Sequence, residues 1–138
     1  ILVESLNLQD SVQFLGRVSD EDRNRLYAQS WLSVQPSSHE GWGITVIESN
    51  FFGCPIVASN IPGLRDSVLD GQTGILVKPK SVSGFAKAIL KVFRRPVLRQ
   101  KMSELGIQRA KKFNWSENTN HFLLAVKNYL INQDINPA

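Results

Sequence analysis

The chain has 138 residues, of which 42% are hydrophobic and 20% charged, and its formal net charge is +4. This length suffices for one domain but not for two of ordinary size, and the composition is that of a globular protein. No apolar run approaches the roughly 20 residues of a membrane-spanning helix, and no nucleic-acid-binding motif accompanies the basic charge. The single cysteine, Cys54, excludes an internal disulfide, and we predict that it is a small buried residue.

Short strand-like runs alternate with longer helical patterns along the chain, which is typical of parallel βαβ units. We therefore predict an α/β fold: a three-layer, Rossmann-like domain with a mostly parallel sheet of about four strands, in which residues 1–138 form a single partial domain. In chain order, the predicted elements are a strand at 12–16, a helix at 19–30, a strand at 31–36, a helix at 44–52, a strand at 55–59, a short helix at 62–69, a strand at 75–77 and helices at 82–93, 97–111 and 116–131.

The first residues indicate that further segments precede this chain. Residues 1–6 have the pattern of the end of a helix. The four predicted strands are also fewer than the average of about five or six strands in a sheet. We expect two upstream strands that, in a complete domain, lie between the strand at 12–16 and the other three.

Two glutamates flank a glycine-rich turn that begins a predicted helix. Glu40 stands in the loop after the strand at 31–36, where open parallel sheets bind ligands, and Glu48 lies just over one turn into the helix. Gly41 and Gly43 permit a ligand to approach the backbone closely, and the free N–H groups of a helix start can bind a diphosphate. Since carboxylates accept hydrogen bonds from hydroxyls, the pattern predicts a site for a sugar joined to a nucleoside diphosphate.

From the residues alone, a structural explanation of this pattern stays open. A loop glutamate before a helix stabilises the positive end of the helix dipole, and a helical glutamate is commonly solvated. The pattern is not a dinucleotide fingerprint, because Val46 occupies the position of the third glycine. His39 has no evident carboxylate to orient it as a general base, and no His, Cys and Asp residues have metal-ligand spacing, so no metal site is predicted.

Several motifs, taken in order, resemble the C-terminal domain of the family 4 retaining glycosyltransferases (glycosyl transferases group 1), which have the GT-B fold. The resemblance covers nearly the whole chain, and the ordered series is much more specific than its E-x7-E element alone. The matching segments are VQFLGRV at 12–18, PSSHEGWGITVIE at 36–48, GCPIVAS at 53–59, PG at 62–63, DGQTGILV at 70–77 and FNW at 113–115.

The resemblance implies transfer of a sugar from a nucleotide-diphosphate sugar to an acceptor hydroxyl with retained configuration, and no metal or other cofactor. Glu40 would contact the transferred sugar in the catalytic centre, and Glu48 would bind the ribose of the nucleotide. The other donor-binding residues would be Gly41, Trp42, Gly43, Ile44 and Thr45 beside the sugar and diphosphate, with Gly16, Arg17 and Val18 beside the nucleobase.

The sequence departs from the family pattern in several places. Trp42 stands where phenylalanine is common, and Asn50 and Phe51 replace a small Ala-Met pair, so we expect different packing of that helix. The family's basic pair that binds the diphosphate and its acceptor-binding N-terminal domain fall outside these residues. We therefore expect the chain alone to recognise a donor without turning it over. The C-terminal helix at 116–133 would pack on that N-terminal domain, and we expect part of its apolar face to be exposed here.

The predicted partners are a nucleotide-sugar donor, an acceptor of unknown identity and the N-terminal domain of the same protein. We expect no nucleic acid and a cytoplasmic location, and a peripheral contact with the inner face of the membrane stays open. Two alternatives from other classes also remain: a GT-B-fold epimerase that acts on the sugar nucleotide itself, and a module that binds nucleotide without catalysis.

Overall fold

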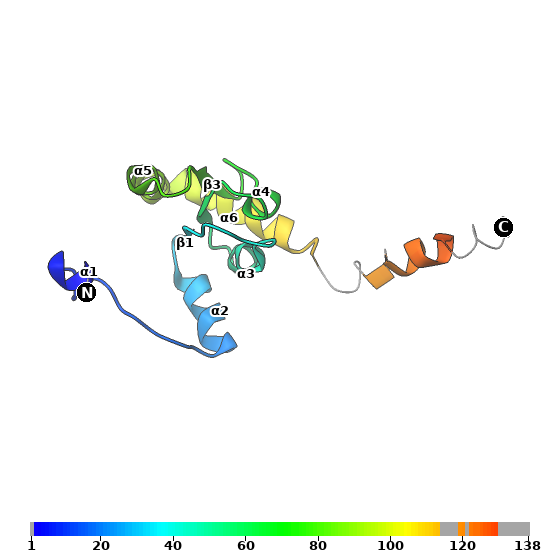
Figure 1. The fold of residues 1–138 in the computed structure, drawn as a ribbon, viewed down its shortest axis with the longest axis horizontal. Helices are drawn as coiled ribbons and strands as arrows, with labels where there is room; N and C mark the ends of the chain where they lie inside the picture. Colours follow the sequence, from blue (N-terminus) through cyan, green and yellow to red (C-terminus); the bar gives the residue numbers. More distant parts are fainter. Residues whose placement is uncertain (1, 114–118, 121, 130–138) are drawn as a thin grey trace.

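The computed structural model describes residues 2–113, 119–120 and 122–129 (Figure 1). The predicted helices and strands between residues 19 and 111 are all present, with bounds that differ from the prediction by no more than two residues. In chain order the elements are α1 (Leu2–Ser5), α2 (Asp20–Gln29), β1 (Ser33–Gln35), α3 (Ile44–Phe51), β2 (Ile56–Ser59), α4 (Leu64–Ser67), β3 (Gly74–Val77), α5 (Val82–Phe93) and α6 (Pro96–Ala110).

The sheet consists of three parallel strands in the order β1-β2-β3, so each strand pairs with its neighbour in sequence. Ile56 of β2 is in register with Ser33 on one side and with Gly74 on the other. A Cβ on Gly74 would lie 2.4 Å from the carbonyl oxygen of Ile56, so this close approach of β3 to β2 requires glycine. All four residues of β2 are buried, as expected for a central strand that is covered on both faces.

The strand predicted at 12–16 is wrong, because these residues form an irregular segment between α1 and α2. A strand needs a partner for its backbone ladder, and among the described residues β1 pairs only with β2. Gly16 has a φ of 62°, which lies outside the extended region, and the Phe14 side chain is 75% exposed. Within the described part of the chain, the sheet therefore has three strands where about four were expected.

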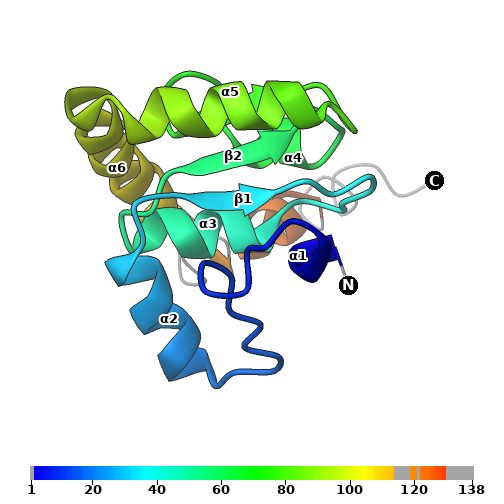
Figure 2. The same ribbon diagram turned by 90° about the vertical axis from the view of Figure 1, so that its left-hand side faces the viewer.

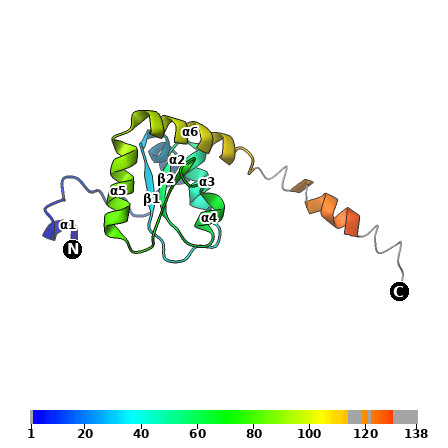
Figure 3. The same cartoon turned by 90° about the horizontal axis from the view of Figure 1, so that it is seen from above.

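Helices cover both faces of the sheet, which produces the predicted three layers (Figure 3). On one face, α5 packs Phe85 and Ala88 against Val57. On the other face, Val46 of α3 and Leu64 of α4 pack against the opposite side chains of β2. Helix α6 closes one end of the layers through contacts with α3 and α5.

Asn50 of α3 packs against Gly106 of α6. Its side chain is buried, and its Nδ2 donates to the carbonyl oxygen of Cys54 at 3.1 Å. A Cβ on Gly106 of α6 would lie 3.1 Å from Cγ of Asn50, so the glycine leaves room for a larger side chain on α3. Asn50 stands where the family commonly has a small residue, and the glycine at position 106 of α6 provides the space for the larger side chain.

The predicted C-terminal helix at 116–133 lies partly outside the described residues. Residues 119–120 and 122–129 are helical, and the described apolar side chains Phe122, Leu124 and Tyr129 are exposed, as expected. The packing of this helix on another domain stays a prediction. Among the described residues, no helix combines the length and the apolar character that crossing a membrane requires.

Cys54 is fully buried, as predicted, and its thiol is expected to be unreactive in the native protein. Burial raises the pKa of the thiol from 9.0 to about 11, and a hydrogen bond with Ser33 opposes part of that rise. Since only the thiolate reacts, the native protein at pH 8 should react with a disulfide reagent about 100-fold more slowly than the denatured chain. Absorbance of the released thiol measures both rates, and equal rates would show that Cys54 is accessible.

Candidate functional site

The segment that carries both predicted glutamates begins at the carboxyl end of β1 and continues into α3 (Figure 2). The two glutamates line different cavities. Glu40 lines a cavity of about 550 Å³ together with His39 and Gly41, which we call the Glu40 cavity. Glu48 lines a cavity of about 660 Å³ together with Trp42, which we call the Glu48 cavity. Gly41 therefore borders one cavity and the next residue, Trp42, borders the other.

A chain of hydrogen bonds holds the Glu40 side chain. Gln35, the last residue of β1, donates from Nε2 to Oε2 of Glu40 at 2.7 Å, and its Oε1 accepts from the Thr45 hydroxyl at 2.8 Å. The backbone N–H of Gly41 donates to Oε1 of Glu40 at 3.2 Å. Each carboxylate oxygen therefore has one donor in place, and its remaining lone pairs can accept from the hydroxyls of a bound sugar.

The start of α3 is an uncapped helix end. Its N-cap residue is Gly43, with φ 76° and ψ 52°, and no side chain caps the helix. A Cβ at residue 43 would lie 2.7 Å from the Ser67 hydroxyl and 2.9 Å from Cδ2 of Leu64, so this turn passes close to α4. The N–H groups of Ile44 and Thr45 are left at the positive end of the helix dipole, which favours binding of an anion.

Gly63, the residue before α4, supports the backbone of the Glu40 loop. It has φ 82° and ψ −54°, a combination that residues with a side chain rarely adopt. A Cβ here would lie 2.5 Å from the carbonyl oxygen of Glu40 and 2.6 Å from that of Gly41. The loop and the start of α4 therefore touch through backbone atoms, and this contact positions Glu40.

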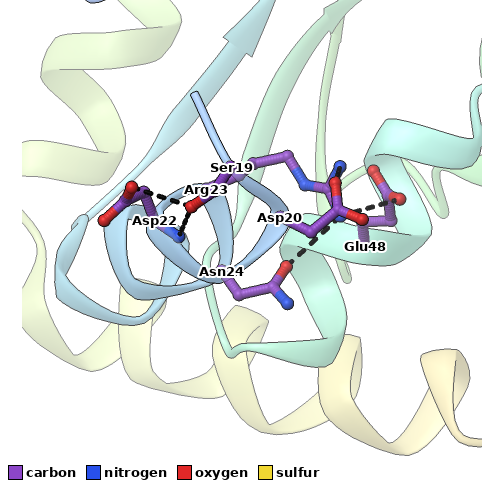
Figure 4. A network of polar contacts seen from close by, with 6 residues as sticks. All are labelled: Ser19, Asp20, Asp22, Arg23, Asn24 and Glu48. Atoms are coloured by element: carbon purple, nitrogen blue, oxygen red, sulfur yellow. Dashed lines mark hydrogen bonds and ion pairs between the residues drawn. The ribbon is translucent and has the colours of Figure 1, made fainter. Parts of the chain in front are cut away.

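Glu48 projects from α3 toward α2 and forms an ion pair with Arg23 (Figure 4). Nη2 of Arg23 lies 3.4 Å from Oε1 of Glu48, and Nη1 of the same side chain lies 2.9 Å from Oδ1 of Asp20. About a third of the Arg23 and Glu48 side chains is exposed, so water weakens the pair and Glu48 stays accessible to a ligand. The pKa of Tyr27 in α2 is raised, mainly by burial of the side chain and to a smaller extent by the negative charge of Glu48.

Apolar and aromatic side chains form most of the wall of the Glu48 cavity. Ile44 and Phe51 line it from α3, and Phe113 lines it from the segment after α6. The rings of Trp42 and Phe113 meet edge to face with centroids 5.0 Å apart, and the guanidinium of Arg109 lies 5.3 Å from the centroid of Phe113. A carboxylate in such a wall suits a flat ligand that also carries hydroxyl groups.

The structure does not bring residues 16–18 to either cavity. Gly16 and Arg17 are exposed, Val18 is half-buried, and none of the three lines the Glu40 or the Glu48 cavity. The segment leads into Ser19, whose hydroxyl caps α2. The contact of residues 16–18 with a nucleobase stays a prediction.

Three contacts at the candidate site were not predicted from the sequence. Gln35 orients Glu40, Arg23 pairs with Glu48, and Gly63 touches the loop backbone. A glutamine that ends an apolar strand was a visible signal for the first. The Arg23–Glu48 pair depends on a contact between elements that are distant in sequence, which no local pattern predicts. Gly63 belongs to the PG motif at 62–63, but its contact with the Glu40 loop could not be read from that motif.

The chemical groups gathered at this end of the sheet are carboxylates, an amide, a hydroxyl and backbone N–H groups. This set is suited to recognition of hydroxyl groups and an anion. Among the described residues, no group of three or more His, Cys, Asp or Glu side chains could hold a metal ion. The expectation that the reaction needs no cofactor stays a prediction.

Comparisons with known proteins identify the family and the fold of this chain. The sequence model of the family described as "Glycosyl transferases group 1" matches residues 2–109. The chain is 32% identical to O-antigen chain mannosyltransferase B from Escherichia coli over 91% of its own length and 32% of that protein. Among solved structures, sucrose-phosphate synthase from Thermosynechococcus elongatus superposes with a TM-score of 0.86 at 29% identity, over 94% of this chain and 33% of that one.

A second solved structure, Anabaena HepE in complex with UDP, has the same fold, with a TM-score of 0.85 at 22% identity over 91% of this chain and 35% of that one. The chain thus spans about a third of the length of the relatives and structures named here.

Proposed function

We propose, because the chain belongs to the glycosyl transferases group 1 family, that it binds the nucleotide-sugar donor of a glycosyltransferase. The chain would supply the donor half of the catalytic centre, and an N-terminal domain of the same protein would supply the acceptor half. The chain's share of about a third of its relatives supports this division.

One observation carries the proposal: the uncapped start of α3 lies between two oriented carboxylates at the carboxyl end of the sheet. In open α/β sheets, ligands bind at that end. The N–H groups of Ile44 and Thr45 would bind the diphosphate, because the helix end carries partial positive charge. Glu40 would accept hydrogen bonds from the sugar and Glu48 from the ribose, each in its own cavity.

The proposed reaction transfers the sugar from its diphosphate to an acceptor hydroxyl with retained configuration. The bond between the anomeric carbon and the diphosphate oxygen breaks, a bond from that carbon to the acceptor oxygen forms, and the acceptor's hydroxyl proton passes to the departing diphosphate. The helix end would stabilise the negative charge that develops on the departing diphosphate. Glu40 would hold the sugar against this end while the bond breaks, and the uridine, guanosine or adenosine identity of the donor stays open.

Titration of the chain with UDP, GDP and ADP tests the proposal. We expect binding of at least one of them, and we expect Glu48→Gln to weaken that binding by about tenfold, because a charged acceptor of the ribose hydroxyls is lost. Calorimetry measures the dissociation constants. Glu104→Gln, the same change at an exposed position of α6, should leave them unchanged.

Two results would contradict this assignment. Binding of none of the three nucleotides would remove the donor function from this chain. Equal dissociation constants for the unmodified protein and Glu48→Gln would remove Glu48 from the site.

A further inference from the structure

The corner where α5 meets α6 combines exposed aromatic side chains with positive charge. We define this α5–α6 corner by six residues from the segment before β1, the last turn of α5 and the start of α6: Trp31, Leu90, Phe93, Arg94, Arg95 and Val97. Strand β1 begins near this corner and ends at the loop that carries Glu40, so the corner and this loop lie at opposite ends of the sheet (Figure 2).

The apolar side chains of the corner are ordered yet exposed. The rings of Trp31 and Phe93 are 5.3 Å apart, and each residue is 56% exposed. Arg99 holds this pair, because its guanidinium lies 4.2 Å from the Trp31 ring centroid and its Nη1 donates to the Phe93 carbonyl at 3.1 Å. Val97 is 82% exposed and Leu90 is 44% exposed. Such a cluster keeps apolar surface in water at a cost that a partner would relieve.

The charge around the corner has one sign. Residues 71–103 contain eight lysines and arginines and no aspartate or glutamate. Arg94 and Arg95 lie at the junction of the two helices and are exposed. The partner that complements this surface is therefore anionic.

The shape of the corner favours a flat partner. None of the cavities that contain Glu40, Glu48 or Val82 includes a residue of the corner. A single strand of nucleic acid would require successive stacking platforms along a groove, whereas the corner offers one aromatic pair. Tryptophan and phenylalanine beside arginine match a membrane interface, where the rings enter the headgroup layer and the cations reach lipid phosphates.

We propose that the α5–α6 corner docks on an anionic lipid surface, with Trp31 and Phe93 inserted at headgroup level and Arg94 and Arg95 against lipid phosphates. This docking would leave the loop at the opposite end of the sheet, with the Glu40 cavity, uncovered by the membrane. The proposal does not depend on the function proposed above.

Cosedimentation with vesicles tests the docking. The protein should bind vesicles of equal parts phosphatidylglycerol and phosphatidylcholine, and it should not bind phosphatidylcholine alone. The double variants Arg94→Glu/Arg95→Glu and Trp31→Ala/Phe93→Ala should each weaken this binding by about tenfold or more. As a matched control, Lys111→Glu/Lys112→Glu makes the same change in net charge away from the corner and should alter binding by less than about twofold.

A second measurement does not depend on the folding of those variants. Brominated phosphatidylcholine in the anionic vesicles should quench the tryptophan fluorescence of the unmodified protein, and Trp31→Phe should remove most of the quenching. Three results would overturn the proposal: equal losses for the two charge-reversal pairs, quenching that persists without Trp31, and displacement of the protein from vesicles by a single-stranded RNA oligonucleotide at an equal concentration of phosphate. The last result would assign the corner to nucleic acid.

Discussion

Gly63→Ala is expected to lower the free energy of unfolding by about 3 kcal/mol. The backbone at residue 63, with φ 82° and ψ −54°, is strained for any residue with a side chain. The new Cβ would also stand 2.5 Å and 2.6 Å from the carbonyl oxygens of Glu40 and Gly41, so either the loop or α4 must move. Urea unfolding followed by circular dichroism measures the loss, and nucleotide affinity should fall with it.

Two other glycines separate the causes of this effect. Gly71 has φ 73°, but a Cβ at this residue would have no neighbouring atom within 4 Å, so Gly71→Ala should show the conformational cost alone, about 1 kcal/mol. Gly41 has free space and a φ outside the left-handed region, so Gly41→Ala should change stability by less than about 0.5 kcal/mol. If Gly63→Ala costs no more than Gly71→Ala, the backbone contact with the loop does not stabilise the fold.

In the full-length protein, Glu40→Gln is expected to lower kcat by at least about 100-fold while nucleotide affinity changes by less than about threefold. The substitution keeps the size of the side chain but removes its charge. A glutamine at position 40 would also keep only one acceptor oxygen, and its amide NH2 would face either Gln35 Nε2 or the Gly41 N–H, both of which are donors. Release of nucleoside diphosphate from a series of nucleotide sugars measures kcat, and calorimetry measures the affinity.

Glu21→Gln, at an exposed position in the first turn of α2, is the matched control and should leave kcat unchanged. Gln35→Leu should give an intermediate loss of about tenfold, because Glu40 keeps its charge but loses its anchor. Full turnover by Glu40→Gln would remove Glu40 from the catalytic centre. Interconversion of sugar nucleotides without an acceptor would favour an epimerase, and nucleotide binding without turnover by the unmodified full-length protein would favour a binding module.

The elements from α2 to α6 could be predicted because each rests on local signals. Ser19 and Ser81 cap their helices. The run at 55–59 is short and apolar without alternation, which is typical of a strand covered on both faces. The segment at 12–16 has an equally apolar pattern, but strand formation needs a partner, which is a property of the whole sheet. The same apolar pattern therefore produced one correct and one wrong prediction.

The candidate site could likewise be predicted from the sequence only in part. The spacing of Glu40 and Glu48 around a glycine turn placed both residues at the carboxyl end of β1 and in α3. It could not show that they line separate cavities, because that depends on how α3 packs between α2 and α4. The partners Gln35 and Arg23 become visible only once β1 and α2 are placed beside the loop and the helix.

The order of the strands also bears on how the chain folds. Because β1, β2 and β3 pair strictly in sequence order, each new strand leaving the ribosome finds its partner already synthesised. The connections between them contain short helices, so closing each βαβ loop costs little chain entropy compared with a pairing of distant segments. Pairing of β2 with β1 and of β3 with β2 can therefore follow the order of synthesis, and we expect α6, which contacts α3 and α5, to pack after these layers exist.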